Sequence, residues 1–366
     1  MTTAIAEIVY KLARIREALD EAGAAAIRLR GTDWFAWATG GASNTVLLAA
    51  ETGIAEVFVT AHNAWILTDE IEAQRLTDEQ LPADFQLQVN PWAQPEQRAT
   101  FVQEVIGDGK ILSDRPIFKE VALPTTLLQH KQILLPIEID RYRQVGRLAG
   151  EAMTEALAQA KPTWTEYELA GAGAAAMWSR GLHPALTLVA GARRLPLYRH
   201  PLPTEAPIGQ VAMMVFCARG AGLYANLTRF IHFGALSSAQ VKLHEQLREI
   251  EATILNQSQP NTALNLVYNS IAQAYKQYGY PQAIQQHHQG GTTGYLGREV
   301  IATPTTENVL TAGMAIAWNP SLPGAKIEDT FMIHANGTLE NLTVDPSWPM
   351  VTVAGRDRPI PLQLDL

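Results

Sequence analysis

Side chains that could move protons or hold an anion gather in a few short stretches of the second half of the chain. These stretches are VFCARG (215–220), ANLTRF (225–230), HHQGGTTGYLGRE (287–299) and KIEDT (326–330). A histidine near a carboxylate could activate water, and the planar fork of an arginine suits a carboxylate ligand. These residue types therefore indicate a site for a small anionic molecule.

Cys217 is the only cysteine of 366 residues, and it allows two interpretations. It is a nucleophile if a base or cation activates the thiol, and otherwise a small buried residue of a central strand. The adjacent His287 and His288 invite a metal site, but neighbours in an extended chain point to opposite faces. We therefore do not expect both to ligate one ion, and whether one of them faces the cleft stays open.

Arginines are concentrated in the same part of the chain, at positions 193, 194, 199, 219, 229 and 298. One interpretation is structural: Arg229 pairs with a carboxylate and the others are solvated. The other is that Arg298, together with Arg199, supplies the positive charge of the site.

The elements that precede these stretches predict a small α/β domain over residues 1–130. Apolar residues recur at helical spacing between Ile5 and Leu19, and a second helix is expected over 95–106. Strands are predicted in four runs, 24–30, 45–51, 55–70 with a turn at 61–63, and 110–114.

Residues 131–366 carry the chemical stretches and read as two helices followed by antiparallel strands, twice over. A helix ends before Pro162, and Thr165 with Glu168 forms a capping box for the next one. Strands follow over 186–191, 211–217 and 223–233. Ser237 with Gln240 then opens the second pair of helices. This order predicts a duplicated α+β domain with its site between the halves.

Composition excludes several classes of function. The formal charge is −8 with no basic cluster, which argues against nucleic-acid binding. No apolar run approaches the roughly 20 residues that span a bilayer, and a single cysteine forms no disulfide within the chain, as in cytoplasmic proteins. We expect a cytoplasmic protein with no membrane or nucleic-acid partner.

In order and motifs, the chain resembles the pita-bread family of creatinase, prolidase, aminopeptidase P and methionine aminopeptidase. The resemblance implies an α+β pita-bread domain preceded by an α/β creatinase-type domain, and a homodimer. In this family two aspartates, one histidine and two glutamates hold two divalent metals. The matching positions here are Cys217, Asn226, Gly291, Asn319 and Glu328.

Only Glu328 keeps the family's residue type, so we expect no metal pair and no cofactor, and no stoichiometric manganese, cobalt or zinc in this cleft. Arg298 replaces a second family histidine, and His200 matches a further one, with His232 as a rival. The resemblance implies two sets of site residues. The catalytic set is His200, His287, His288, Arg298 and Glu328, and the substrate-binding set is Cys217, Asn226, Asn319, Arg199 and Tyr295.

Three functions follow from this set. The first is a metal-independent, creatinase-like hydrolase of a small amide or C–N substrate. The second is an inactive pseudo-peptidase that binds a peptide or a metabolite. The third, and least favoured, is a metal-dependent Xaa-Pro peptidase with unusual ligands.

Overall fold

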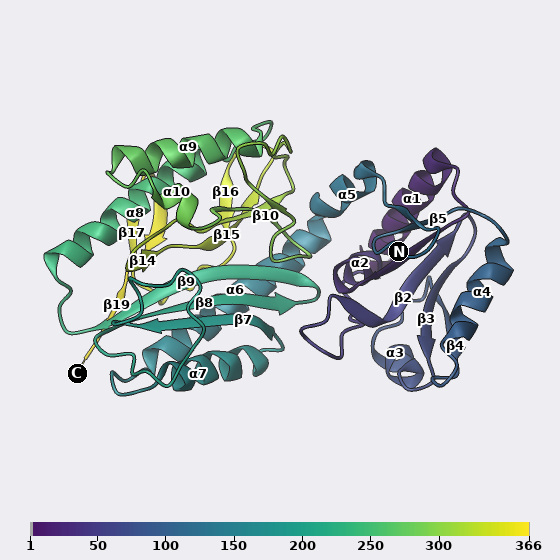
Figure 1. Ribbon diagram of the computed structural model, residues 1–366, viewed down its shortest axis with the longest axis horizontal. Coiled ribbons are helices and arrows are strands. Elements are labelled where there is room, and N and C mark those ends of the chain that lie inside the picture. Colours follow the sequence, from purple (N-terminus) through teal and green to yellow (C-terminus); the bar gives the residue numbers. More distant parts are fainter. Residues whose placement is uncertain (1–2, 366) are drawn as a thin grey trace. The chain divides into compact units, whose positions relative to one another are not determined.

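The computed structural model describes residues 3–365, and the chain divides into two compact units, 1–138 and 139–366 (Figure 1). The boundary predicted at residue 130 falls inside helix α5 (Thr125–Gln132). Among the helices of residues 3–365, none has the length and apolar character needed to span a bilayer.

The first unit is a six-stranded mixed sheet with helices. Its strand order is β4-β3-β2-β1-β5-β6, and β2 runs antiparallel to both β1 and β3. Its elements besides α5 are α1 (Thr3–Ala22), β1 (Ala26–Gly31), α2 (Thr32–Ala38), β2 (Thr52–Thr60), β3 (Ala64–Asp69), α3 (Ala73–Glu79), β4 (Gln86–Asn90), α4 (Glu96–Ile106), β5 (Ile111–Ser113) and β6 (Val121–Ala122).

The strand predicted over 45–51 is wrong, because this run forms bends and a turn. Val46 and Leu47 are 58% and 67% exposed. The side chain of Asn44 donates to the carbonyl of Ala55 at 2.6 Å, and the amide of Ile54 donates to the carbonyl of Asn44. These bonds hold the start of the loop against β2. Because β1 and β3 already pair with the two edges of β2, that strand has no free edge for the apolar run.

The second unit contains the predicted duplication. Its first half is α6 (Pro136–Ala158), α7 (Glu166–Trp178), β7 (His183–Gly191), β8 (Val211–Gly220) and β9 (Leu223–Phe233). Its second half begins with α8 (Ser238–Gln257), α9 (Leu264–Gln277) and α10 (Ala283–Gln286). The remaining strands are β10 (Gly290–Thr293), β11 (Val300–Ile301), β12 (Ala315–Trp318), β13 (Ser321–Leu322), β14 (Ala325–Lys326), β15 (Asp329–Ile333), β16 (Leu339–Asn341), β17 (Met350–Val353), β18 (Arg356–Pro359) and β19 (Leu362–Leu364).

Each half of this unit packs its helices on its own sheet. One core joins α6 and α7 to the sheet β19-β9-β8-β7, and another joins α8 and α9 to the sheet β11-β10-β12-β15-β16 (Figure 1). Both predicted capping boxes are present, with Thr165 and Ser237 as the N-cap residues. Each box satisfies backbone N–H groups that the first helical turn would otherwise leave unpaired.

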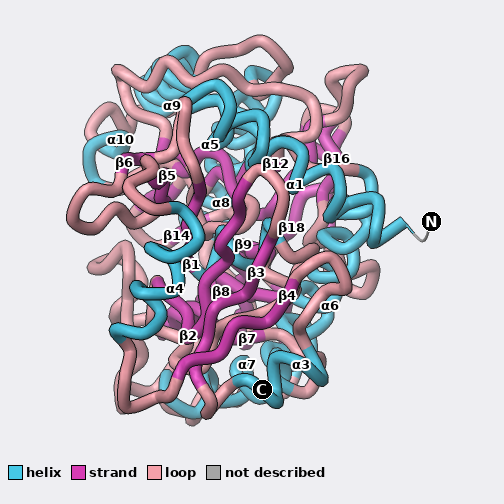
Figure 2. The backbone as a smooth tube through the Cα atoms, turned by 90° about the vertical axis from the view of Figure 1, so that its right-hand side faces the viewer, coloured by secondary structure: helices cyan, strands magenta, loops and turns pink. Residues whose placement is uncertain are grey.

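Strands β8 and β9 are the long strands that carry much of the predicted site, and they run side by side as an antiparallel pair in Figure 1. Figure 2 shows the same backbone turned by 90° and coloured by secondary structure. A two-residue turn joins them, with Ala221 and Gly222 both at positive φ (47° and 78°). Such a turn matches the twist of the hairpin. At the junction of the two halves, the amide of Thr228 donates to the carbonyl of Glu328 at 3.0 Å. This bridge brings residues 100 positions apart into one site.

Candidate functional site

The five positions predicted from the motifs lie around this junction. Cys217 and Asn226 face each other across β8 and β9. Gly291 lies in β10, Asn319 directly follows β12, and Glu328 directly precedes β15. Strands β10, β12 and β15 are neighbours in one sheet, and the backbone bridge at Glu328 connects that sheet to β9.

Asn226 is fully buried and held by hydroxyl groups of the other half. Its backbone amide donates to Thr330 Oγ1 at 2.8 Å, and that hydroxyl donates to the Asn226 carbonyl at 3.0 Å. Its Nδ2 donates to Thr293 Oγ1 at 3.0 Å. Its Oδ1 is buried without a hydrogen-bond partner, and so is Oδ1 of Asn319. These two oxygens are acceptors that a ligand carrying N–H groups could satisfy.

Glu328 is the one acidic side chain at these five positions, and two cations neutralise it. Arg298 Nη2 lies 2.5 Å from Oε1, and Lys326 Nζ lies 3.4 Å from Oε2. Thr228 Oγ1 also donates to Oε2 at 3.1 Å. Burial alone would raise the pKa of Glu328, but the two positive charges and the hydrogen bonds lower it to about 2. The carboxylate is therefore ionised and already paired.

Gly291 stands where the family's metal-binding histidine is expected, and the backbone leaves no room for a side chain there. Its φ is +158°, and a Cβ on it would lie 2.0 Å from the carbonyl oxygen of Val300. At its neighbour Gly290, with φ +102°, a Cβ would lie 2.1 Å from the carbonyl oxygen of Ala317. The local backbone has thus adapted to glycine.

Cys217 does not have the surroundings of an activated thiol. Burial, with the nearby charge of Glu328, raises its pKa to about 11. The thiol is therefore protonated at neutral pH, which favours the interpretation of a structural strand residue over that of a nucleophile.

Both His287 and His288 lie beside His200, rather than on the opposite faces expected for neighbours in an extended chain. Their rings stack with centroids 4.4 Å apart, and His287 Nε2 lies 2.8 Å from His200 Nε2. The pair follows the last turn of α10, and the bend into β10 turns the two side chains together. His232 lies apart from them and its Nδ1 contacts the carbonyl of Gly234 at 2.7 Å.

Burial and positive neighbours keep these three imidazoles neutral. Burial and the charge of Lys326 lower the pKa of His287 to about 3. Burial and the charge of Arg298 lower the pKa of His288 to about 4. The pKa of the exposed His200 is also lowered, by burial of its ring and by Lys326. At neutral pH each ring therefore has a lone pair on one nitrogen.

Of the remaining predicted site residues, Arg199 donates from Nη2 to Gln286 Oε1 at 2.5 Å, and burial lowers its pKa. It borders a pocket that Lys326 also lines. Tyr295 is fully buried.

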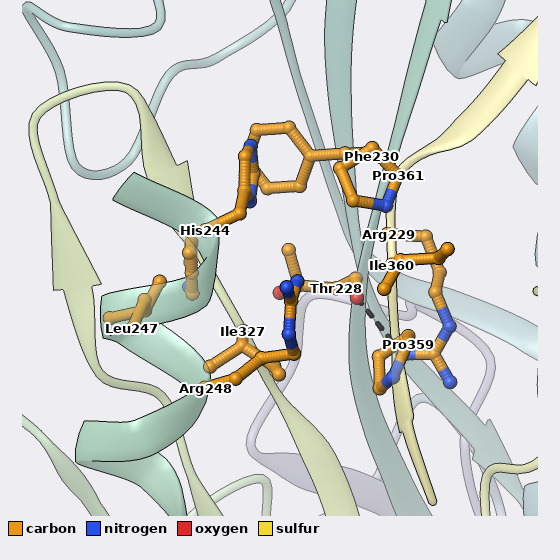
Figure 3. Close-up of a pocket in the computed structure, with 11 residues that line it drawn as sticks. Thr228, Arg229, Phe230, His244, Leu247, Arg248, Ile327, Pro359, Ile360 and Pro361 are labelled. Atoms are coloured by element: carbon orange, nitrogen blue, oxygen red, sulfur yellow. Dashed lines mark hydrogen bonds between the residues drawn. The ribbon is translucent and has the colours of Figure 1, made fainter. Parts of the chain in front are cut away.

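Sequence reasoning missed two cations, Lys326 and Arg248. Lys326 lines the pocket of Figure 3 together with Thr228 of the site, and its charge acts on all three histidines. In the same pocket Arg248 reaches from α8 toward Thr228 (Figure 3). Lys326 could have been found from the sequence, because it lies in the KIEDT motif two residues before Glu328. No sequence signal pointed to Arg248, because it lies on a helix in a stretch without a motif.

Arg248 is 8% exposed, and its guanidinium makes no hydrogen bond or ion pair with any residue in the described range 3–365. The pocket it enters has a volume of about 20 Å³. Its walls are mixed: Phe230, Ile327 and Ile360 are apolar, whereas His244 and Lys326 are polar or charged. That volume is room for one or two small polar groups. The charges of Glu245, Glu251 and Glu249 act on Arg248 from a distance, but none of these carboxylates forms an ion pair with it. A guanidinium in a pocket without a direct ion pair favours an anionic group beside it.

The residues at the five positions do not fit a pair of divalent metals. Two amides, a protonated thiol and a glycine without space for a ligand stand in place of four ligands, and the surviving carboxylate is neutralised. Hard dications need anionic oxygen ligands to replace their lost hydration. Within residues 3–365 the one cluster of potential ligand atoms is His200, His287 and His288, whose nitrogens lie within 4.8 Å of one another.

Comparison with known proteins identifies a family and several solved structures of similar fold. Residues 140–335, more than half of the chain, match the model of metallopeptidase family M24. No curated protein sequence matches the chain. Its structure is similar to a Xaa-Pro dipeptidase from Bacillus anthracis, with 19% identity, coverage of 98% of this chain and 100% of the other, and a TM-score of 0.79.

Two further solved structures are similar. A prolidase from Pyrococcus horikoshii has 20% identity, covers 92% of this chain and 98% of its own, and has a TM-score of 0.77. The N-terminal domain of the FACT complex subunit SPT16 from chickpea has 12% identity, covers 92% and 96%, and has a TM-score of 0.70. These likenesses confirm the fold class expected from the sequence, α+β pita-bread.

Proposed function

This chain belongs to metallopeptidase family M24, and from that premise we propose that it hydrolyses a small amide or other C–N bond without the family's pair of metals. The observation that carries the proposal is the state of Glu328. Its carboxylate is buried and ionised, and it is neutralised by Arg298 and Lys326, so it has no charge left to offset a dication. The space at Gly291 supports the same proposal, because no histidine fits there.

The cations indicate how a substrate would be held. Arg298 is already engaged with Glu328, whereas the guanidinium of Arg248 forms no hydrogen bond or ion pair within residues 3–365. A carboxylate of the substrate in the Figure 3 pocket would pair with Arg248 and lie near Lys326. The unpaired amide oxygens of Asn226 and Asn319 would accept N–H groups of the substrate. The ligand class is therefore a small amide or short peptide that carries a carboxylate.

His200, oriented by His287, supplies the proton chemistry. Neutral His200 is exposed and can take a proton from water. His287, with its pKa lowered to about 3, stays neutral, and its contact with His200 at 2.8 Å orients the His200 ring. A neutral imidazole in this position acts as a general base. Glu328 acts through Arg298, which it orients, because its own pKa is too low for proton exchange near pH 7.

A second candidate is binding without catalysis. The protonation states of Glu328 and Cys217, with pKa values of about 2 and about 11, favour it because neither group exchanges protons near pH 7. The likeness to a chickpea FACT subunit domain also shows that this fold is not confined to structures named as peptidases.

The test is turnover by untagged protein dialysed against excess chelator. We would assay dipeptides, N-acylated amino acids and small ureido or guanidino acids for release of amine. Turnover that persists in chelator and is lost in His200→Ala supports the proposal, whereas turnover that requires added metal contradicts it. Saturable binding of a substrate analogue without turnover would establish the second candidate.

Elemental analysis of the same dialysed protein gives an independent measurement. We expect no manganese and no pair of metals at the five positions. Arg248→Gln should weaken binding of a carboxylate ligand by about tenfold or more, because it removes a charge-assisted hydrogen bond worth about 1.5–3 kcal/mol. Lys242→Gln, at an exposed position of the same helix, removes the same charge and should leave binding unchanged.

A further inference from the structure

The histidine cluster consists of His200, from the loop after β7, and His287 and His288, between α10 and β10. None of the three occupies one of the five positions where the family holds its metals. One nitrogen from each ring lies within 4.8 Å of the other two, and the ring centroids are 4.4, 4.6 and 5.8 Å apart.

We propose that His200, His287 and His288 together bind one late transition-metal ion, Cu²⁺ or Zn²⁺ in preference to Mn²⁺, with an open fourth position. Three imidazole nitrogens are a known ligand set for such ions, whereas Mn²⁺ prefers carboxylate and water oxygens.

The geometry needs only small side-chain movements. Metal–nitrogen bonds of about 2.0–2.1 Å in a tetrahedral site place the nitrogens about 3.3 Å apart. The His200–His287 contact at 2.8 Å would open by a few tenths of an ångström, and His288 would close from within 4.8 Å. Nδ1 of His288 has no hydrogen-bond partner to lose. His200 is exposed and offers the ion a route in from solvent.

The surrounding charges set the selectivity. Lys326 and Arg298 repel a cation at this point, and Glu328 offsets one of the two charges. An ion held by weak or purely electrostatic bonds would be excluded, which disfavours Mn²⁺ further. The remaining positive charge favours an anion, such as chloride or a carboxylate, as the fourth ligand.

Binding at this cluster is independent of the proposed hydrolase activity. The functional consequence rests on that proposal: a bound ion occupies the lone pair that His200 would use as a base, so Cu²⁺ or Zn²⁺ should inhibit turnover. Chelator would then raise activity or leave it unchanged. Failure of the hydrolase proposal would leave the binding result unaffected, because binding is measured without substrate.

The experiment is calorimetric titration of untagged, chelator-dialysed protein with Cu²⁺, Zn²⁺ and Mn²⁺, with visible absorption to follow Cu²⁺. We expect one Cu²⁺ or Zn²⁺ per chain and Mn²⁺ at least about 100-fold weaker. His288→Ala should weaken Zn²⁺ binding by more than about tenfold, since even changes to outer partners of metal ligands cost about 10–100-fold. His200→Ala, at an exposed position that does not disturb the core, should do the same.

Two matched controls separate this site from others. His183→Ala removes a half-buried histidine outside the cluster and should leave affinity unchanged. Cys217→Ala alters one of the five family positions and should also leave it unchanged. The proposal is overturned by absence of saturable Cu²⁺ and Zn²⁺ binding, by equal affinity in His200→Ala and His288→Ala, or by loss in Cys217→Ala with retention in His288→Ala.

Discussion

At the scale of single residues, the site has the charge pattern of an anion site. One carboxylate, that of Glu328, sits between Arg298 and Lys326, and Arg248 lies nearby without a partner. The family's other acidic metal-ligand positions here hold uncharged residues, and Arg298 and Lys326 lie beside the one remaining carboxylate, Glu328. These changes in charge alter the kind of ligand that the same backbone favours. A dication gains little there, while a carboxylate ligand would gain a charge-assisted bond to Arg248 beside the charge of Lys326.

Cys217 gives a prediction at this scale. With its pKa raised to about 11, only about one thiol in a thousand is ionised at pH 8. Alkylation by iodoacetamide should be far slower than in the urea-unfolded protein at pH 8. Its rate should rise about tenfold per pH unit up to about pH 11, because the thiolate is the reactive species. Labelling at pH 8 as fast as in urea would show that the thiol is activated in the fold.

At the scale of elements, the close packing of strand β10 leaves no room for a metal-binding side chain in the site. Its first two residues, Gly290 and Gly291, have positive φ and pack against backbone carbonyls of the neighbouring strands. The metal-binding histidine of the family could not return by a single substitution, since the strand would have to move first.

Gly291→Ala tests this packing. We expect a loss of about 2 kcal/mol or more in the free energy of unfolding, because the added Cβ would overlap a backbone carbonyl oxygen. Urea unfolding measures it, and Gly294→Ala is the control, where a Cβ meets nothing closer than 3.5 Å. Equal stability of the two variants would mean that β10 can relax. Gly291→His, if it folds, should bind no additional metal.

At the scale of the whole molecule, the homodimer implied by the family resemblance stays a prediction. The loop before β2 exposes Val46, Leu47 and Leu48 in succession, an apolar run of the kind found at protein contacts. We expect light scattering to give about twice the 40.0 kDa chain mass. Val46→Ser with Leu47→Ser should weaken the dimer if this loop takes part. A monomer at working concentration would contradict the prediction.

The sequence by itself predicted the order of helices and strands in the second unit, but it missed α2, α3, β4 and α5 of the first unit. Helical periodicity, the capping boxes at Thr165 and Ser237, and alternating strands predicted the duplicated α+β domain, because these signals act within a few residues of each other. The motifs also located the five family positions. The strand prediction for 45–51 was wrong because apolar content alone does not provide a neighbouring strand to pair with. Here Asn44 binds the backbone of β2 and the run that follows forms a loop.

Only the tertiary structure decided which side chains contact one another around those five positions. That His287 and His288 both turn toward His200 depends on a contact across 87 residues, and the bridge that places Glu328 beside Thr228 spans 100. The roles of Lys326 and Arg248 likewise arise from neighbours on other elements. Local patterns carry no record of such distant contacts, because packing and charge pairing are set where the halves of the domain meet.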